Sequence, residues 1–475
     1  MMLPLPLPLL LALQSALSLA PPPPSAPPAP PVPPPPALLA VAGAQDSARL
    51  TLAAAVERAL ATHPSVAAAT ALLYRAAADL GAARAARRPA LALDGGLTRY
   101  ELPWIVKPLH GFDPRNLPLF DETLLQAGLS LGWTVLDFGS RAARVRAQGA
   151  LGDAADAALA TARRQLTARA VGAYLRVLTA RGVLAAHDQR LEALAAASAR
   201  VRQLVAEGKA ARLEQLRVDA ELKRGQADRI ATAAQLDVSE HELALLADLP
   251  YAAVHASRLA ALTLADTALA ADTGTAQRNA LVARAGELNG DVRELRHRAR
   301  AAGVLLDAAR ATWLPEVRFG GAYVDRGRWS GDHSAEWQAG LALAYPLYTG
   351  GARTSTIQRA AADERIAAAQ LRGTELAIAR GVDQALAALR EAHARVAALA
   401  GAVEQSAEVA RIERLSLDVG SGTQTQYLDA EANLLRARAG LVEARHAEIA
   451  ARVELAGIVG ELSREWLART VESSQ

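Results

Sequence analysis

An internal duplication dominates this sequence of 475 residues. The segment around Val56, Val66 and Pro89 recurs 226 positions later, and residues 127–141 recur 212 positions later as residues 339–353. Two constant offsets mean two gapless blocks, and the difference of 14 residues falls between positions 100 and 126. Self-similarity of this kind indicates two repeats of one structural unit, with a longer loop in the first repeat.

Each repeat contains a long stretch of helical periodicity. Val177, Leu184 and Leu191 keep a seven-residue spacing, with alanine at most of the places between them. A 3.5-residue hydrophobic repeat predicts helices that supercoil around one another. We expect long helices at 141–207 and 352–419, return helices at 212–248 and 424–466, and helices of about half the long length at 52–87 and 281–312.

Between the helices the hydrophobic period becomes two. From Leu125 to Val135 the odd positions are apolar and the even positions are small or polar, and residues 337–347 repeat the pattern. Such segments of about ten residues with aromatic ends are typical of transmembrane barrel strands. The alternative is a soluble sheet with one face on a core. We expect strands near 90–100, 122–136, 316–325 and 334–348, and we expect that residues 101–121, which contain four prolines, cannot continue a strand.

Four strands cannot close a barrel, because about eight are the minimum. Open strand edges in lipid would leave backbone groups without hydrogen-bond partners. The membrane hypothesis therefore requires an oligomer. Two copies would give eight strands, whose interior is filled by side chains, whereas three copies would give twelve strands and can leave a pore.

The N-terminal region resembles an export signal. Residues 1–20 are predicted to be a signal peptide, with an apolar stretch at 3–19 that ends in Ser18-Leu19-Ala20. A second small-residue site ends at Ala44, so that cleavage as late as 44 stays open. Residues 21–50 are a proline-rich linker with the composition of an extended polyproline II segment. After the signal no run of 18 apolar residues occurs, so that entry into a membrane would require strands.

Several classes of function are disfavoured. The formal net charge is +3 without a block of like charge, which gives no footprint for nucleic acid. The sequence has no cysteine and none of the common catalytic motifs, and His187 and His241 are lone helical residues. We therefore expect no enzyme, no cofactor and no metal site. A structural coiled-coil tether would not need two strand pairs, and a periplasmic adaptor would not contain two equal copies.

The pattern resembles the TolC family of outer-membrane factors over residues 51–466. The similarity is carried by TLAAAVERALATHPSV at 51–66, LDFGSRAARVRAQGA at 136–150, LYTGGARTSTIQRAA at 347–361 and LDVGSGTQTQYLDAEANLLRARAGL at 417–441. On this alignment residues 51–262 are the first repeat, residues 263–466 are the second, and residues 467–475 are a C-terminal tail.

The resemblance implies a mainly α fold with a transmembrane β part. Three protomers would form a twelve-stranded outer-membrane β-barrel continuous with a periplasmic α-barrel of long coiled-coil helices. The expected location is the outer membrane, with a long periplasmic extension and contact with outer-membrane lipid. The implied partners are a periplasmic adaptor (a membrane fusion protein) and an inner-membrane ABC exporter or proton-driven pump. The duct itself would perform no chemistry.

The resemblance also implies functional residues at the periplasmic end. Family members close this end with carboxylates at the start of a return helix, where this sequence has Asp429 and Gln426; the first copy offers Glu214 at the place of Gln426. The family's basic residue in the preceding turn is replaced by Gly422. Two structural explanations stay open, because Thr423 and Gln426 match a capping box and Asp429 suits a helix N-terminus.

The glycine-containing turns are the expected adaptor-docking tips, although these glycines also fit simple helix C-caps. The tip residues are Gly208, Lys209, Gly420, Ser421 and Gly422.

The cargo is the remaining question. Family members that serve proton-driven drug or metal pumps often carry a lipid on an N-terminal cysteine, and this sequence has no cysteine. We therefore favour type I protein secretion, as in the outer-membrane component that exports an adenylate cyclase toxin of the RTX type. The alternative is the outer component of a proton-driven multidrug or metal efflux pump.

Overall fold

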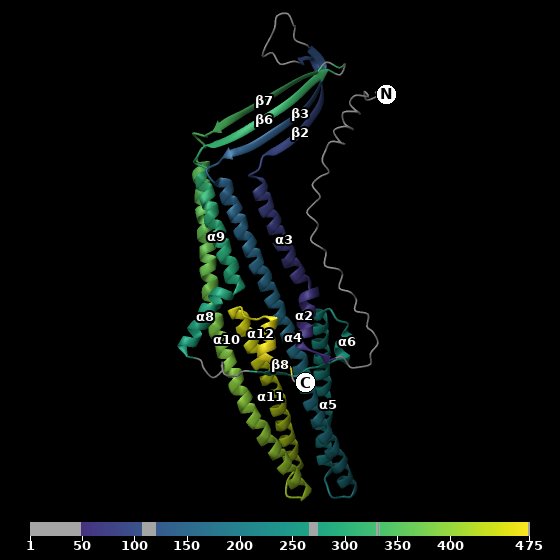
Figure 1. The fold of residues 1–475 in the computed structure, drawn as a ribbon. Helices are drawn as coiled ribbons and strands as arrows, with labels where there is room; N and C mark the ends of the chain where they lie inside the picture. Colours follow the sequence, from purple (N-terminus) through teal and green to yellow (C-terminus); the bar gives the residue numbers. More distant parts are fainter. Residues whose placement is uncertain (1–48, 107–119, 266–273, 329–330, 332, 474–475) are drawn as a thin grey trace, which may run out of the picture. The chain divides into compact units, whose positions relative to one another are not determined.

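Two long helical hairpins are the largest elements of the chain (Figure 1). In the first, α4 (Ser140–Ala206) turns into α5 (Arg212–Ala247); in the second, α10 (Ala352–Asp418) turns into α11 (Gln424–Val459). Both long helices have 67 residues, both return helices have 36, and each second-copy helix begins 212 positions after its counterpart. At about 1.5 Å per residue the long helices span roughly 100 Å, which confirms the duplicated long helices that the sequence predicts.

The structure is a computed structural model that describes residues 49–106, 120–265, 274–328, 331 and 333–473. The elements described here belong to one compact unit, residues 49–475. The predicted signal peptide, residues 21–48 of the predicted linker and the segment around Gly111 lie outside the described residues, so those expectations stay predictions.

Shorter helices run beside the long ones. The expected helices at 52–87 and 281–312 are each broken in two, giving α2 (Leu52–Thr62) with α3 (Pro64–Ala85) and α8 (Thr275–Leu288) with α9 (Gly290–Ala311). The breaks lie at His63 and Asn289, 226 positions apart, and both residues cap the following helix with their side chains. His63 precedes a proline, which disfavours helical backbone at His63. Both breaks were missed because each side of them keeps a helical pattern.

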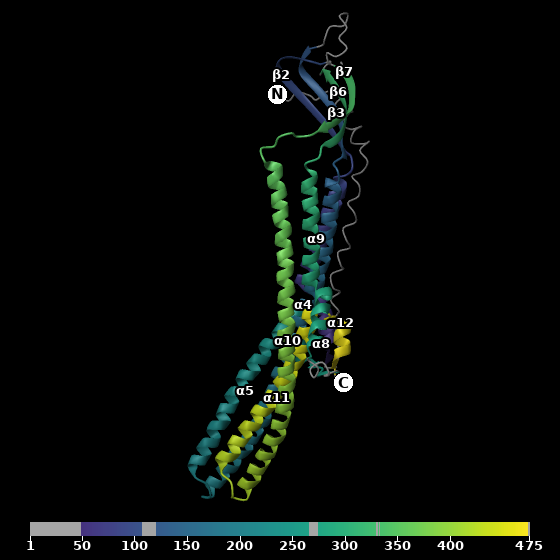
Figure 2. The same cartoon turned by 90° about the vertical axis from the view of Figure 1, so that its left-hand side faces the viewer.

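A four-stranded antiparallel sheet lies at one end of the helices (Figures 1 and 2). It consists of β2 (Ala90–Ile105), β3 (Phe120–Leu136), β6 (Glu316–Arg328) and β7 (His333–Ala344), in the order β2-β3-β6-β7. Opposite Leu129 of β3 lie Leu93 of β2 and Tyr323 of β6, and opposite Tyr323 lies Trp337 of β7. The four predicted strands are therefore present, with β2 and β7 as the edges.

Two strand limits differ from the expectation. β2 continues through Pro103 to Ile105, so the prediction that residues 101–121 cannot continue a strand is wrong for residues 101–105. An edge strand tolerates the missing N–H of Pro103, and the register shifts between Arg99 and Trp104. At the other edge β7 ends at Ala344 instead of 348, before Pro346.

Small elements form a belt around the middle of α4. The pairs are β1 (Arg49–Leu50) with β4 (Arg258–Leu259), parallel, and β5 (Leu262–Leu264) with β8 (Val471–Ser473), antiparallel. The helices α6 (Tyr251–Ala256) and α12 (Arg464–Thr470) complete the belt. The fully buried Tyr174 hydroxyl donates to the carbonyl oxygens of Leu50 at 2.8 Å and Ala260 at 3.0 Å. This hydrogen bonding fixes the belt to α4.

The belt corrects the expected C-terminal limits. The return helix predicted at 424–466 ends at Val459, because Gly460 adopts a left-handed conformation with φ of 93°. Residues 467–473 of the predicted tail are structured, since they complete α12 and form β8. Trp466, Leu467 and Val471 are buried in the largest hydrophobic cluster together with Tyr174.

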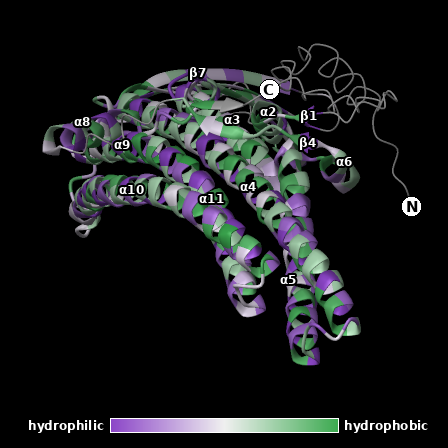
Figure 3. Cartoon of the chain, turned by 90° about the horizontal axis from the view of Figure 1, so that it is seen from below, coloured by the Kyte–Doolittle hydropathy of each residue, from purple (hydrophilic) through white to green (hydrophobic). Residues whose placement is uncertain are grey.

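The helices are not apolar throughout. Hydrophobic and hydrophilic residues interleave along α4, α5, α10 and α11 (Figure 3).

Within the described residues, none of the helices is both long and apolar enough to span a bilayer.

Candidate functional site at the hairpin tips

The two hairpin tips, residues 204–219 and 416–431, lie at the end of the helices opposite to the sheet (Figures 1 and 2). A buried cluster joins the two hairpins close to the tips, with members from α4, α5 and α11 that include Val201, Val218 and Leu428. Arg217 of α5 donates to the Thr425 hydroxyl of α11 at 3.5 Å. The predicted site residues of both repeats therefore lie together at the end of the helices opposite to the sheet.

The two tips are the same turn built twice. Gly208 and Gly420 have φ values of 71° and 79°, in the left-handed region that favours glycine. In the first tip the Lys209 N–H donates to Leu204 O at 2.8 Å, and in the second the Ser421 N–H donates to Ser416 O at 2.9 Å. Both glycines thus act as helix C-caps, as the structural explanation expects. Their role in docking an adaptor stays a prediction.

Gly422 differs from its counterpart in the first tip, Ala210. A Cβ atom at Gly422 would lie 2.9 Å from the Ser416 Cβ and 3.1 Å from the Leu417 backbone nitrogen. The backbone there therefore leaves no room for the larger basic side chain of the family pattern without a shift of the turn.

Lys209 is one of three exposed cations of the first tip, beside Arg212 and Arg217. Its ammonium lies 2.9 Å from the carboxylate of Glu207, which also accepts a hydrogen bond from Gln203 at 3.0 Å. The hydrogen bond from Lys209, followed by that from Gln203, lowers the pKa of Glu207 below its usual value. The Glu207 carboxylate therefore partly neutralises Lys209.

Gln426 belongs to a complete capping box. Its Oε1 accepts from the Thr423 N–H at 2.9 Å, and its own N–H donates to the Thr423 hydroxyl at 3.3 Å. This geometry confirms the box that the sequence spacing indicates. The side chain is held against its own helix terminus, and a role for Gln426 in an aperture stays a prediction.

Asp429 and Glu214 are the two carboxylates of the predicted aperture. Asp429 lies in the second turn of α11 and is exposed, whereas Glu214 lies in the first turn of α5 and is half-buried. Among the described residues, neither side chain takes part in a hydrogen bond or an ion pair. Both carboxylates are therefore free to act on an ion or a neighbouring chain.

Sequence reasoning missed Arg217, a basic residue of this site. Arg217 occupies in the first tip the position of Asp429 in the second, because the two are 212 positions apart. Its contact with Thr425 brings a positive charge to the first turn of α11. The second tip, residues 416–431, contains no basic residue of its own. The offset between the repeats was the signal that could have found it.

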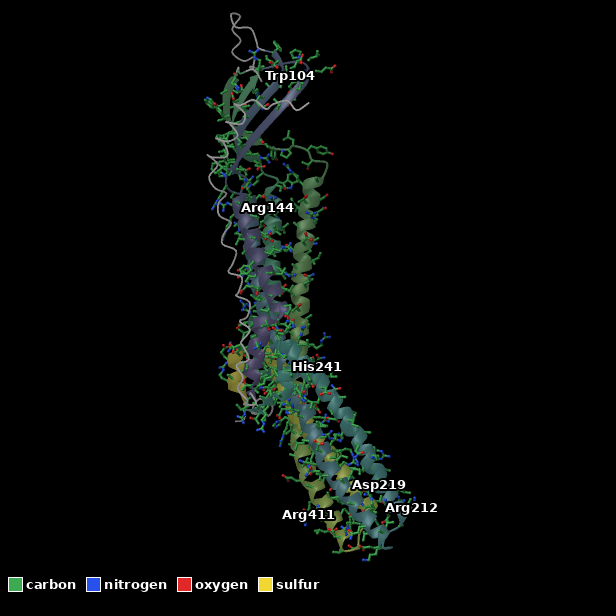
Figure 4. All side chains as sticks on the ribbon, turned by 90° about the vertical axis from the view of Figure 1, so that its right-hand side faces the viewer. Trp104, Arg144, Arg212, Asp219, His241 and Arg411 are labelled. Atoms are coloured by element: carbon green, nitrogen blue, oxygen red, sulfur yellow. The ribbon has the colours of Figure 1, made fainter. Side chains whose placement is uncertain are left out.

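Further charges surround the tips. Arg200 of α4 pairs with Asp418 at the end of α10, and Asp219 of α5 accepts from the Ser198 hydroxyl at 2.6 Å. Figure 4 shows Asp219 and Arg212 near the tip of α5, with Arg411 near the tip of the other hairpin. The tips therefore carry charges of both signs on a rigid helical support.

Comparison with known structures places this fold among outer-membrane channels. The outer membrane protein VceC from Vibrio cholerae matches with a TM-score of 0.73 and 21% identity, covering 86% of this chain and 96% of VceC. A membrane protein from Pseudomonas aeruginosa matches with a TM-score of 0.75 and 22% identity, covering 87% and 91%. The CmeC outer membrane channel from Campylobacter jejuni matches with a TM-score of 0.74 and 15% identity, covering 86% and 85%.

The sequence itself identifies the family. The family model described as "Outer membrane efflux protein" matches residues 39–247 and 281–461, which is more than half of the chain. The chain therefore belongs to the outer membrane efflux protein family, whose members are outer-membrane channels with a periplasmic helical tunnel and act as ducts without catalysis. A comparison with curated protein sequences found no match.

Proposed function

We propose that three copies of this chain form a continuous exit duct across the outer membrane and the periplasm. The observation that carries the proposal is the open sheet. β2 and β7 each pair on one side only, and the apolar face of the sheet is exposed over Leu93, Trp337 and Leu343 by 73%, 77% and 70%. Closure of three such sheets would pair both edges and direct the apolar faces toward lipid.

The duplication predicts how the edges meet. Within the chain, Leu129 of β3 lies opposite Tyr323 of β6. Transfer of this pair by the two repeat offsets, 212 and 226 positions, places Leu341 of β7 opposite Leu97 of the next protomer. Both leucines are more than half exposed in the single chain, at 69% and 53%. The contact between protomers would then repeat the contact between the two halves of one protomer.

The tips give the duct its partners and its aperture. They lie at the end opposite to the sheet, where a periplasmic adaptor connected to an inner-membrane transporter would dock. Gly208, Lys209 and residues 420–422 are the proposed docking residues. Threefold symmetry would bring three copies of Asp429 together near one axis, flanked by Glu214 and Gln426. Like charges held together attract cations, so the carboxylates would set the ion preference of the aperture.

For the cargo we propose protein export by a type I system, with a toxin as the expected class. The support is compositional: the sequence contains no cysteine, the residue that often carries a lipid in channels of proton-driven pumps. The alternative is the outer component of a proton-driven drug or metal pump. The family is named for efflux, which supports this alternative.

Disulfide crosslinking tests the assembly. Because the natural chain has no cysteine, the double variant Leu97→Cys with Leu341→Cys contains only the two intended thiols. We expect oxidised outer membranes to give bands up to a covalent trimer on non-reducing gels. The matched control, Leu129→Cys with Tyr323→Cys, uses the equivalent pair within one chain and should give monomers only. A soluble periplasmic monomer, or identical band patterns from the two variants, would contradict the proposed trimer.

Crosslinking in the native cell tests the cargo class. Mass spectrometry of proteins crosslinked to Lys209 should identify an adaptor, and the adaptor should in turn retain an ABC exporter. Recovery of a proton-driven pump instead would favour the efflux alternative and leave the duct itself unaffected.

A further inference from the structure

A cluster of metal-ligating side chains lies where α5 meets α6, away from the sheet and the tips. Asp237, Glu240 and His255 each offer one donor atom, and these atoms lie within 4.8 Å of one another. It is the one group of at least three such residues with this spacing in the described part of the chain. We propose that it binds a divalent transition-metal ion of the Zn²⁺ type.

The chain brings the ligands together through one turn. Asp237 and Glu240 are three positions apart on α5 and therefore share a face of the helix. The helix ends at Ala247 with Asp248 as its C-cap, and Pro250 precedes α6, which carries His255 back against that face. Figure 4 shows the position of His241, which follows Glu240 on α5.

The donor set is the kind that Zn²⁺ takes. His255 Nδ1 lies 2.7 Å from Glu240 Oε2, and the Tyr251 hydroxyl lies 3.3 Å both from Asp237 Oδ1 and from His255 Nδ1. Zn²⁺ accepts imidazole nitrogen and carboxylate oxygen at about 2.0–2.2 Å, commonly with water completing a four-coordinate site. At these distances a tetrahedral angle places two ligand atoms about 3.3–3.6 Å apart, so the 2.7 Å contact between His255 and Glu240 would open by roughly 0.6–0.9 Å to admit the ion.

A partly buried arginine, Arg181, fixes the central ligand. Glu240 is only 1% exposed, and its Oε1 accepts from Arg181 Nη2 at 2.6 Å and from Nε at 3.2 Å. Arg181 also donates to the carbonyl oxygens of Val254 and Ser257, so its guanidinium is anchored to α6. Glu240 therefore presents its second oxygen, Oε2, toward His255. Second-shell contacts of this kind orient ligands and tune metal affinity.

Aromatic stacking orders the exposed side of the cluster. The His241 ring stacks on Tyr251 with centroids 3.9 Å apart, and its Nδ1 lies 2.8 Å from the Asp237 carbonyl oxygen. The ring of His255 stacks on the same tyrosine at 5.4 Å. Tyr251 is thus held between two imidazoles, with its hydroxyl directed at the ligands.

The second repeat does not contain this cluster. At an offset of 212, Asp237, Glu240 and His255 correspond to Ile449, Arg452 and Leu467. Ile449 and Leu467 are buried apolar residues of the main cluster. The ligand set is therefore not a requirement of the shared helical scaffold, and an ion bound there would tie α6 to α5 in one repeat only.

Zinc titration tests the proposal on the full-length protein, purified in detergent and freed of metal with a chelator. The matched control is His393→Ala, because His393 Nδ1 contacts Glu448 Oε1 at 2.6 Å in a His–Glu pair without a third ligand. By isothermal titration calorimetry we expect about one Zn²⁺ per chain for the wild type and His393→Ala. For His255→Ala and Asp237→Asn we expect a loss of affinity of roughly tenfold or more.

Replacement of Zn²⁺ by Co²⁺ gives an independent measurement, because its visible absorption reports the ligands directly. We expect a Co²⁺ spectrum for the wild type that disappears in His255→Gln, a milder variant for the case that alanine impairs folding. Equal Zn²⁺ binding by all variants, or no binding by the wild type, would overturn the proposal and leave a hydrogen-bonded cluster only.

Discussion

At the scale of single residues, the two repeats differ in the charge of equivalent side chains at the hairpin tips. The same position carries Arg217 in the first tip and Asp429 in the second, and Glu214 corresponds to Gln426. The backbone turn is shared, so these substitutions change charge while the geometry is kept. The capping box at Gln426 and the glycine caps could be predicted from spacing, whereas the reach of Arg217 to Thr425 required the packing of two hairpins.

Removal of the Asp429 carboxylate should change the ion preference of the duct. In planar bilayers, Asp429→Asn should lower cation selectivity and weaken block by multivalent cations, because a ring of negative charge is lost. Arg217→Gln should act in the opposite direction and raise cation selectivity. Asp363→Asn, which removes an exposed carboxylate of α10 far from the tips, is the control. Wild-type selectivity in Asp429→Asn, combined with reduced thermal stability, would make Asp429 a helix-end residue only.

The buried hydroxyl of Tyr174 predicts a stability change in alkaline solution. Burial, the largest cause, raises the pKa of Tyr174 to about 12, above the value near 10 of an unfolded tyrosine. The folded-state pKa is raised, so the stabilisation is complete below about pH 10 and is lost as the pH rises through 12. Tyr174→Phe should cost about 1–3 kcal/mol at neutral pH, because the carbonyl oxygens of Leu50 and Ala260 lose their donor.

Denaturant midpoints at pH 8 and pH 11 would measure both effects. Tyr174→Phe should be less stable at pH 8 and should lose less stability on going to pH 11. Some dependence should remain, because burial also raises the pKa of Tyr427 to about 12. The half-exposed Tyr74 supplies the control substitution, Tyr74→Phe, which should match the wild type at both pH values.

At the scale of elements, the two return helices end in equivalent turns made by different residues. Asp248 ends α5 with φ of 50°, and Gly460 ends α11 with φ of 93°. A left-handed conformation costs a residue with a Cβ about 1–2 kcal/mol relative to glycine. At Gly460 a Cβ would also lie 2.6 Å from the carbonyl carbon of Leu288 and 2.8 Å from the backbone nitrogen of Asn289.

Substitution of these two residues should change the free energy of unfolding in opposite directions or by different amounts. Asp248→Gly should leave the free energy of unfolding unchanged or raise it by up to about 1 kcal/mol, because the conformational strain is relieved. Gly460→Ala should lower the free energy of unfolding by at least about 1–2 kcal/mol, the cost of a left-handed residue with a Cβ. The new methyl group would also contact the backbone of Leu288 and Asn289, which cannot rotate away. Denaturant unfolding of the two variants beside the wild type measures the difference. A Gly460→Ala variant as stable as Asp248→Gly would contradict the contact with Leu288.

Long elements were predictable and short ones were not. The long helices and the four strands follow from hydrophobic periods sustained over many residues, and their limits lie within a few residues of the expectation. The strands of the belt have two or three residues each, too few to show a period. These strands pair segments that are distant in the sequence: Arg49 lies opposite Arg258, and Val471 lies opposite Leu264.

At the scale of the whole molecule, the family and the fold class were predictable because the duplication, the strand pairs and the motifs agree with one another. The lining of an aperture was not, because it depends on the packing of several protomers. The position of Asp429 on α11 is fixed by one chain, whereas its distance to its own copies belongs to the assembly.

Single-cysteine labelling should determine the orientation of the protein in the membrane. β2 begins at Ala90, shortly after α3, and ends at Ile105, at the end of the sheet away from the helices. Gly111 follows β2 in the sequence and lies outside the described residues, and Gly111→Cys should react with a membrane-impermeant maleimide on intact cells. Lys209→Cys, at a hairpin tip, should react only after permeabilisation. The reverse pattern would contradict the outward orientation of the sheet end.

The fusion of two repeats in one chain also reduces the number of subunits that assembly requires. An unduplicated ancestor with two strands and one helical hairpin would have needed six subunits to supply the twelve strands of the proposed trimer. Six identical subunits can change only together, so that every charge at a tip would face five copies of itself. In the proposed trimer of the fused chain, Arg217 would alternate with Asp429, and the 14 additional residues would occur in one of the two repeats only.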